Sequence, residues 1–348
     1  MVKHRPATWN PLRAPVNVTW EITAQCNLKC RHCLSAGLEA AHSPELTFDQ
    51  CRALIDELSR MDVFQINFGG GEPFLREDFL AVLDYAHAQG IVTCVSTNGT
   101  ILNSALAARL AGMDLLRIQV SLDGATAETN DAIRGRGTYH QILEAIALLR
   151  EHNFPGLSIN TVVTRTNYGE IEALCGLASH YGAKTRLSRF RPSGSAQRVW
   201  AEYRLHSGQL AGLSEFLGAH REVLTGDSFF SIAEGDRRDL GLNACGAARL
   251  TCGILPDGSV YPCAFLTDTA FRGGSILEEP LEQIWHKAPA FDRLRSVRVE
   301  ACETCPRFSL CNGGCPAVAY FLFHSLNCAD PECTASFRGE VAAHAGTI

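Results

Sequence analysis

The chain has 348 residues, of which 46% are hydrophobic and 20% are charged, proportions typical of a soluble globular protein with a sizeable core. Its formal net charge of −6 argues against nucleic acid or an anionic membrane surface as the main partner, because both would favour a basic excess. No apolar run approaches the roughly 20 residues that a membrane helix needs, and the N-terminus has no apolar targeting segment, so we expect a cytoplasmic protein.

Short β-rich runs alternate with amphipathic stretches from residue 16 to about residue 190. The expected strands are residues 16–23, 65–68, 92–96, 116–120, 157–163 and 184–190. The expected helices are residues 47–61 (with Thr47 as a candidate cap), 78–89, 104–111, 139–151 and 168–181. Six such repeats predict a parallel sheet, although periodicity alone does not decide between an open sheet, a closed barrel and a partial barrel.

Four short motifs follow the first four expected strands in chain order. They are a cysteine triplet with the spacing C-x3-C-x2-C, GGGEP (69–73), STNG (96–99) and SLDG (121–124). Because the carboxyl ends of parallel strands meet at one edge of a sheet, we expect all four motifs on one face. A single active site requires that arrangement.

The triplet consists of Cys26, Cys30 and Cys33, and no fourth cysteine lies nearby in the sequence. Three thiolates leave one iron of a cubane cluster without a protein ligand, and an open position distinguishes a catalytic metal centre from a closed structural one. A small molecule that offers an amine and a carboxylate is a suitable ligand for that iron.

The other three motifs have the chemistry to hold such a molecule. Glu72 can accept hydrogen bonds from an ammonium group, the glycines before it allow close backbone approach, and the STNG side chains suit a ribose. The candidate cofactor-binding residues are Gly69, Gly70, Gly71, Glu72, Ser96, Thr97, Asn98, Ser121 and Asp123. Each motif alone is also ordinary turn chemistry, so the interpretation depends on their order after the triplet.

The pattern changes after about residue 200. A helix expected over residues 207–221 leads to TGDSFF (225–230), and a segment rich in cysteine, glycine and proline follows, which we expect metal sites to stabilise. Eight cysteines there suffice for two closed four-thiolate sites: Cys245, Cys252, Cys263, Cys302, Cys305, Cys311, Cys315 and Cys333. The other four, Cys51, Cys94, Cys175 and Cys328, are expected to be core or incidental residues. Spacing alone allows zinc or iron–sulfur clusters, the triplet favours clusters, and disulfides are not expected in a reducing cytoplasm.

Residues 16–190 resemble the radical S-adenosylmethionine (SAM) superfamily in the triplet and its three companion motifs. The resemblance implies a partial (β/α)6 barrel and a [4Fe–4S] cluster on the triplet, with SAM on the open iron and Glu72 near its amino group. One-electron reduction of SAM would give a 5′-deoxyadenosyl radical that abstracts hydrogen from a substrate.

The later cysteines resemble the SPASM domain of peptide- and protein-modifying radical enzymes, whose spacings G-x4-C and C-x2-C-x5-C-x3-C occur at residues 258–263 and 302–315. By that resemblance, auxiliary cluster I is held by Cys245, Cys252, Cys263 and Cys315. Auxiliary cluster II is held by Cys302, Cys305, Cys311 and Cys333, with Cys328 as a rival for the last position. Both would be fully ligated and would serve structure and electron transfer.

The implied fold class is α/β, a partial (β/α)6 barrel followed by a small cysteine-rich SPASM domain, with three [4Fe–4S] clusters and SAM as cofactors. The expected boundaries are residues 1–15 for an N-terminal extension, 16–200 for the barrel, 201–240 for a helical bridge, 241–335 for the SPASM domain and 336–348 for a tail.

Five longer motifs resemble the mycofactocin maturase family: VTWEITAQCNLKCRHCLS, INFGGGEP, QVSLDGATAETNDAIRG, RFRPSG and LTGDSFF. Members of that family oxidatively decarboxylate the C-terminal tyrosine of a small precursor peptide and join it to the adjacent valine. The resemblance implies a radical SAM oxidoreductase that works with a precursor peptide, a separate small peptide-recognition protein and an external one-electron reductant. A first strand near residue 16 leaves no room for a fused recognition domain. Arg189 and Arg191 of RFRPSG are candidates to face a carboxylate of SAM or substrate, or are ion-paired surface residues.

Three other interpretations stay open at this point. Another SPASM maturase, of the pyrroloquinoline quinone or sulfatase-maturing type, would share the ligand pattern. A non-catalytic iron–sulfur electron carrier would not need Glu72 or the ribose-type loop. A zinc-stabilised binding protein would be colourless when replete with metal.

Overall fold

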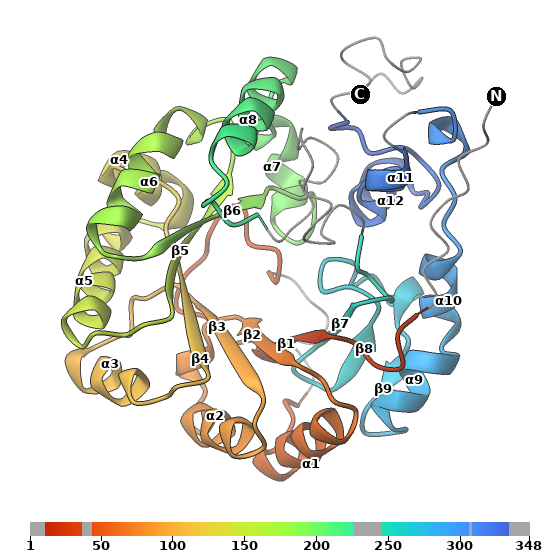
Figure 1. Cartoon of the computed structure of the whole chain (residues 1–348), viewed down its shortest axis with the longest axis horizontal. Coiled ribbons are helices and arrows are strands. Elements are labelled where there is room, and N and C mark those ends of the chain that lie inside the picture. The colour runs from red at the N-terminus through yellow and green to blue at the C-terminus, as the bar shows by residue number, and fades with distance from the viewer. Residues whose placement is uncertain (1–10, 37–43, 226–244, 306–307, 334–348) are drawn as a thin grey trace.

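The computed structural model describes residues 11–36, 44–225, 245–305 and 308–333. Six parallel strands form a curved sheet with helices on its outer side (Figure 1). The strands are β1 (Asn17–Thr23), β2 (Gln65–Gly70), β3 (Val92–Thr97), β4 (Leu116–Ser121), β5 (Leu157–Val163) and β6 (Lys184–Arg189). They pair in sequence order and β6 does not pair with β1, which confirms the predicted partial barrel.

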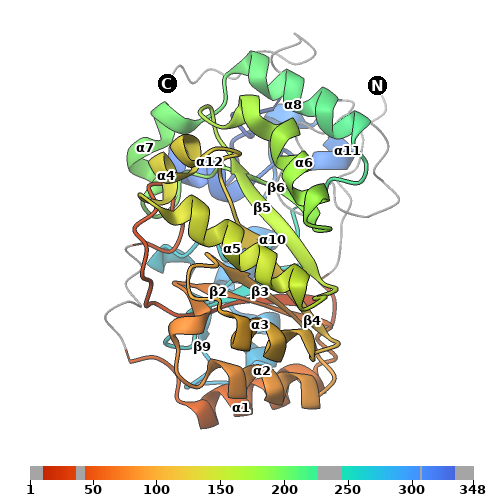
Figure 2. The same ribbon diagram turned by 90° about the vertical axis from the view of Figure 1, so that its left-hand side faces the viewer.

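Helices connect these strands and cover the outer face, as α3 and α5 do in the side view (Figure 2). They are α1 (Phe48–Arg60), α2 (Phe79–Ala88), α3 (Ser104–Ala111), α4 (Ala127–Arg134), α5 (Thr138–Glu151) and α6 (Ile171–His180). Thr47 caps α1 as predicted, because its hydroxyl accepts from the Gln50 N–H while the Gln50 side chain accepts from the Thr47 N–H.

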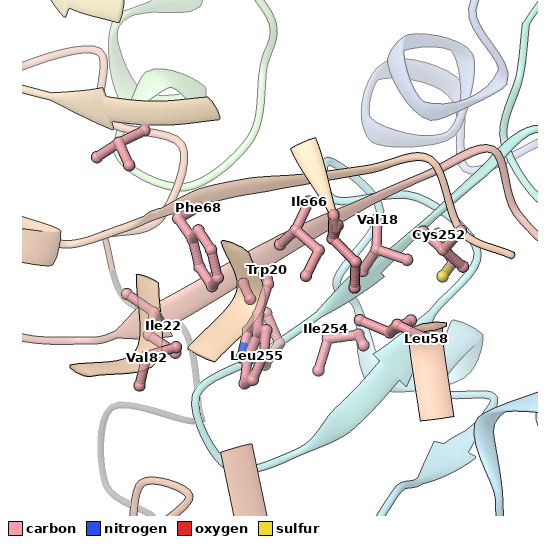
Figure 3. Close-up of a cluster of buried hydrophobic side chains, with 14 of the residues drawn as sticks. Val18, Trp20, Ile22, Leu58, Ile66, Phe68, Val82, Cys252, Ile254 and Leu255 are labelled. Carbon is pink, nitrogen blue, oxygen red and sulfur yellow. The ribbon is translucent and has the colours of Figure 1, made fainter. Parts of the chain in front are cut away.

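The two faces of the sheet differ in polarity. On β1, Val18, Trp20 and Ile22 are fully buried and pack under the outer helices, together with Phe68 of β2 (Figure 3). The alternate positions on the inner face are polar, such as Asn67, Ser96, Gln119 and Ser121, and are only partly buried. A parallel sheet usually buries apolar residues on both faces, so this polar inner face fits a barrel that binds a polar ligand.

The second half of the chain extends the same sheet. Strand β7 (Thr251–Ile254) pairs in parallel with β1, and β8 (Ser259–Tyr261) and β9 (Gly274–Ser275) follow in antiparallel order. The remaining helices are α7 (Ala196–Tyr203), α8 (Ser207–Ala219), α9 (Leu281–Lys287), α10 (Pro289–Arg295), α11 (Phe308–Cys311) and α12 (Pro316–Phe323). Because β1 lies between β2 and β7, barrel and cysteine-rich segment share one continuous sheet.

The six predicted strands and the helices predicted near residues 47–61, 78–89, 104–111, 139–151, 168–181 and 207–221 are confirmed within a few residues. The sequence did not predict α4, α7 or any element after residue 245. The predicted tail and most of TGDSFF lie outside the described residues. In the part of the chain that the structure describes, no helix is long and apolar enough to cross a membrane.

Candidate active site and cysteine clusters

The triplet lies in the loop after β1, as predicted. Cys26 is exposed, whereas Cys30 and Cys33 are partly buried, and the fifteen cysteines, all of which lie in described residues, form no disulfide. Burial raises the pKa of Cys30 to about 11, an effect that nearby Arg134 reduces and the other two thiols of the triplet reinforce. The three thiols therefore lie close enough together to influence one another.

Glu72, at the end of the GGGEP motif, is fully buried beside the triplet loop. Its carboxylate accepts hydrogen bonds from the Thr97 hydroxyl (2.7 Å) and the Asn98 N–H (2.7 Å). Burial raises the pKa of Glu72, while these two hydrogen bonds lower it. The STNG motif thus positions Glu72.

The glycines of GGGEP allow two backbone segments to approach each other. Gly71 donates to the Thr23 carbonyl (2.8 Å) and Glu72 to the Gln25 carbonyl (2.7 Å). A Cβ on Gly71 would lie 1.9 Å from the Gln25 oxygen, so no side chain fits there. A Cβ on Gly70 would lie 2.4 Å from the Thr23 oxygen, whereas a Cβ on Gly69 would meet nothing within 4 Å. The close approach at Gly70 and Gly71 is therefore to the backbone at the end of β1 and of the loop that follows it.

The side chains of the STNG motif differ in how many hydrogen bonds they make within the protein. Asn98 accepts from the Thr100 N–H and hydroxyl and donates to Asn27, so its side chain is engaged within the protein. Ser96 faces inward and accepts one hydrogen bond, from Gln119 at 3.3 Å. The predicted ribose contact therefore remains a proposal that Ser96 supports better than Thr97 or Asn98.

Asp123 of the SLDG motif, a candidate cofactor-binding residue, takes part in a buried ion-pair network. Its carboxylate is completely buried, 2.6 Å from the Arg134 guanidinium and 2.7 Å from the His32 ring, and it accepts from the Val162 N–H. Burial would raise the pKa of Asp123, but Arg134 and His32 more than offset this and lower it to about 2. Since His32 lies between Cys30 and Cys33, this network fixes the triplet loop. Ser121, the last residue of β4, is only partly buried on the inner face.

Sequence reasoning missed three residues of this site: His32, Arg134 and Glu21. Arg134 was missed because the eight-residue helix that carries it was not predicted. Glu21 lies in the second half of β1, is 4% exposed, and burial raises its pKa to about 7. A glutamate between Trp20 and Ile22 in a short β-rich run was the available signal.

Arg189 and Arg191 contact the C-terminal half of the chain. Arg189 donates to both oxygens of Asp330 (2.6 Å each) and to Glu332 (2.5 Å), and all three side chains are buried. Arg189 is therefore ion-paired, as one of the two interpretations from the sequence has it, but it is buried rather than at the surface. Arg191 is 7% exposed and stacks on Phe265, 3.5 Å from the ring centroid.

Seven of the eight later cysteines predicted as ligands, all except Cys252, form two groups. In the first, burial and the neighbouring thiols of Cys315 and Cys263 raise the pKa of Cys245 to about 12. In the second, burial and the thiols of the group raise the pKa of Cys302 to about 12; the group consists of Cys302, Cys305, Cys311 and Cys333. Cys333 rather than Cys328 thus lies among the thiols predicted for auxiliary cluster II.

Cys252 does not lie with the first group. It is a fully buried residue of β7 that pairs with Val18 and packs among Leu58, Ile66 and Ile254 (Figure 3). Burial alone raises its pKa to about 12. The role of Cys252 as a ligand of auxiliary cluster I stays a prediction, although no neighbouring thiol influences its pKa.

The cysteine groups fit iron–sulfur clusters better than zinc. Among the described residues, no three or more His, Cys, Asp or Glu side chains are arranged to hold a single metal ion. The ligands of a cubane bind different irons and stand farther apart than the ligands of one zinc ion.

Comparisons with known proteins agree with this arrangement. The family model described as the radical SAM superfamily matches residues 20–178, and that of SPASM, an iron–sulfur cluster-binding domain, matches residues 245–307. Mycofactocin maturase MftC of Mycobacterium ulcerans is 44% identical over 332 residues, which cover 94% of this chain and 89% of that protein. The AdoMet-dependent heme synthase of Methanosarcina barkeri is 31% identical, with 88% and 93% covered. The crystal structure of Streptococcus suis SuiB bound to S-adenosylmethionine superposes with a TM-score of 0.78 at 20% identity, with 93% and 78% covered, and shows the same fold.

Proposed function

Because the chain belongs to the mycofactocin maturase family, we propose that it oxidatively decarboxylates the C-terminal tyrosine of a small precursor peptide and joins the resulting unit to the adjacent valine. The observation that carries this proposal is the 44% identity to a curated mycofactocin maturase over nearly the whole of both chains. The heme synthase is more distant at 31%, and a PqqA peptide cyclase of Granulibacter bethesdensis at 29%. The alternative maturase types are therefore not favoured.

The protein is a radical SAM enzyme with an iron–sulfur-binding SPASM domain. When bound, a cluster and SAM supply the one-electron chemistry that starts a radical reaction. We propose three [4Fe–4S] clusters, one for each of the three thiol groups. Cys26, Cys30 and Cys33 would hold the cluster that binds SAM.

The protein's own residues prepare the site for SAM. Glu72 presents a buried carboxylate at the triplet loop, and the Thr97 hydroxyl and Asn98 N–H fix its orientation. This geometry suits an ammonium group as the remaining hydrogen-bond donor. The inner-face residues Ser96 and Ser121 would contact the rest of the molecule.

The substrate and partners follow from the family. SuiB has been crystallised bound to its precursor peptide SuiA, which shows that a related fold accepts a peptide. We propose that a separate small recognition protein presents the precursor here and that an external reductant supplies the electron.

The test is anaerobic mass spectrometry of the reconstituted, reduced enzyme with SAM, the recognition protein and a precursor peptide ending in Val-Tyr. We expect 5′-deoxyadenosine together with a peptide that has lost carbon dioxide and two hydrogens. If 5′-deoxyadenosine forms while the peptide stays unchanged, the radical chemistry stands and the mycofactocin assignment fails. A precursor ending in Val-Phe is the matched control, because it keeps the length and the carboxylate and lacks the phenol.

A further inference from the structure

The loop that carries the triplet is bordered by two helices, α4 and α7. The Arg31 N–H donates to the carbonyl of Ile133 near the end of α4 at 3.0 Å. The Ser195 N–H, directly before α7, donates to the Cys33 carbonyl at 2.9 Å. Ile133 and Trp200 of α7 belong to the same buried cluster, and the two helices lie side by side (Figure 2). The triplet loop, the end of α4 and α7 therefore form one continuous surface.

Four exposed cations lie on this surface. Lys29 and Arg31 stand on either side of Cys30 in the loop. Arg136 follows the end of α4, and Arg198 lies on α7. We call Lys29, Arg31, Arg136 and Arg198 the basic surface. The chain as a whole has a net charge of −6, so the basic surface has the opposite sign to the protein around it and would attract an anionic partner.

Two nearby carboxylates neutralise the basic surface only in part. Glu202 lies 3.8 Å from Arg31, but the two side chains are 58% and 50% exposed, and an ion pair so exposed contributes little. Arg198 lies one turn before Glu202 on α7, so both side chains share the helix face next to the loop. Asp131 of α4 accepts hydrogen bonds from backbone N–H groups at the start of α5. In the described part of the chain, no carboxylate forms an ion pair with the other three cations of the basic surface.

The basic surface lies next to the thiols of the triplet. Cys30 is partly buried, and its sulfur is 3.9 Å from the carbonyl of Arg134 at the end of α4. The guanidinium of Arg31, the residue after Cys30, is 5.4 Å from the centroid of the Tyr203 ring on α7. The rate of electron transfer falls steeply with the distance between two redox centres. A protein that docks on the basic surface would therefore have a short path to a cluster on these thiols.

We propose that the basic surface docks an acidic electron-carrier protein, which supplies the single electron that the radical reaction needs. The carrier gives up one electron to the cluster on the triplet; no bond forms or breaks and no proton moves in this step. The four cations are spread over a loop and two helices, which fits the surface of a protein better than a small anion. The presence of the cluster rests on the proposed function, whereas the charge and position of the surface do not.

The test measures how fast the anaerobically reconstituted full chain, with SAM and without peptide, is reduced. The probe is reduced flavodoxin, an acidic one-electron carrier, and rapid-freeze-quench EPR records the cluster signal that SAM alters. In Lys29→Glu/Arg136→Glu/Arg198→Glu, the rate at low salt is expected to fall by roughly 10- to 100-fold. The wild-type rate should fall as salt is added, and the variant should lose this dependence. An unchanged rate would overturn the proposal.

A matched control makes the same change in net charge elsewhere. Arg60→Glu/Lys184→Glu/Lys287→Glu replaces three exposed cations outside the basic surface: Arg60 ends α1, Lys184 begins β6 and Lys287 ends α9. Its rate of reduction by flavodoxin should stay near that of the wild type. An equal fall in both triple variants would mean that the net charge of the protein decides the rate, which would overturn docking on the basic surface.

Two small reductants separate docking from damage to the cluster. Dithionite, an anion, and reduced methyl viologen, a cation, need no docking surface. The Lys29→Glu/Arg136→Glu/Arg198→Glu variant should keep the wild-type iron content and be reduced by both at close to the wild-type rate. If both slowed as much as flavodoxin, the substitutions would have disturbed the triplet, and the docking assignment would be overturned. Arg198→Glu, on the exposed face of α7, replaces the triple variant if the latter loses iron, and it should still slow flavodoxin several-fold.

The proposed recognition protein with its precursor peptide is the other macromolecule that could use a basic surface. If the triple variant binds that complex more weakly while its reduction by flavodoxin is unchanged, the basic surface serves peptide delivery and the electron-carrier proposal is overturned. None of the reduction measurements requires turnover of the peptide, so a failure of the proposed reaction would be seen separately.

Discussion

Replacing Arg189 with methionine is expected to destabilise the protein strongly. Arg189→Met keeps the apolar stem and removes the guanidinium, so the buried carboxylates of Asp330 and Glu332 lose the cation that both of them bind. Breaking a buried ion pair on one side costs about 3–5 kcal/mol, and two unpaired carboxylates place this change near the upper end. Arg189→Lys should be intermediate, because it keeps the charge but loses the bidentate geometry with Asp330.

The assay is urea unfolding of the anaerobic holoprotein, followed by far-UV circular dichroism. With a slope of about 3 kcal/mol/M, the midpoint should fall by more than about 1 M. Arg13→Ala is the matched control, because the ion pair between Arg13 and Asp62 is exposed (72% and 78%) and should contribute less than about 1 kcal/mol.

The pH dependence of this effect has a definite sign. In the wild type, burial alone would raise the pKa of Asp330, but the charge of Arg189 outweighs burial and the pKa is lowered. The ionised Asp330 therefore stabilises the fold at any pH above its unfolded pKa, and this stabilisation is lost as the pH falls through its folded pKa. In Arg189→Met, burial would raise both carboxyl pKa values, and protonation at acid pH would relieve the penalty. The difference between the two proteins should therefore be largest at neutral pH and shrink below about pH 5. A loss no greater than that of Arg13→Ala, or one independent of pH, would refute this reasoning.

Three further outcomes are expected. Cys30→Ala should abolish formation of 5′-deoxyadenosine while iron analysis still shows the auxiliary clusters, and full activity would contradict the triplet assignment. Glu72→Gln should weaken SAM binding by roughly 10- to 100-fold, measured by calorimetry, because an amide cannot replace a carboxylate opposite an ammonium group; unchanged affinity would remove Glu72 from the site. Gly71→Ala should lower both the melting temperature and the iron content, because its Cβ would lie 1.9 Å from the Gln25 oxygen. The control Gly176→Ala, whose Cβ would meet nothing within 4 Å, should stabilise α6 by about 0.5–1 kcal/mol. Equal melting temperatures for the two variants would show that the Gly71 backbone is free to move.

The barrel was predictable because its strands and helices carry local signals. Alternation of residues such as Trp20 and Glu21, and the capping box at Thr47, are visible in a few consecutive residues. The order of the motifs after the strands also placed the triplet and Glu72 on one edge correctly. Short elements such as α4 and β7 were missed because their stability comes from tertiary contacts rather than from local periodicity.

The roles of Arg189 and Cys252 depend on partners that sequence spacing cannot reveal. The carboxylates bound by Arg189 are 141 and 143 positions away in the chain. Cys252 has the same side chain as its neighbours Cys245 and Cys263, and only the direction in which a strand residue points separates it from them.

The position of β1 between β2 and β7 has a consequence for synthesis of the chain. Thr251, which hydrogen-bonds to Asn17, is 234 positions away from it, so the ribosome completes the whole barrel before β7 is available. During that interval the first strand, which carries Val18, Trp20 and Ile22 on one face, has an unpaired edge, and an unpaired edge can pair with other chains. Cells that produce this protein with too little chaperone capacity should therefore accumulate aggregates of incompletely synthesised barrels. Supplying residues 245–333 as a separate polypeptide should not dissolve these aggregates once they have formed.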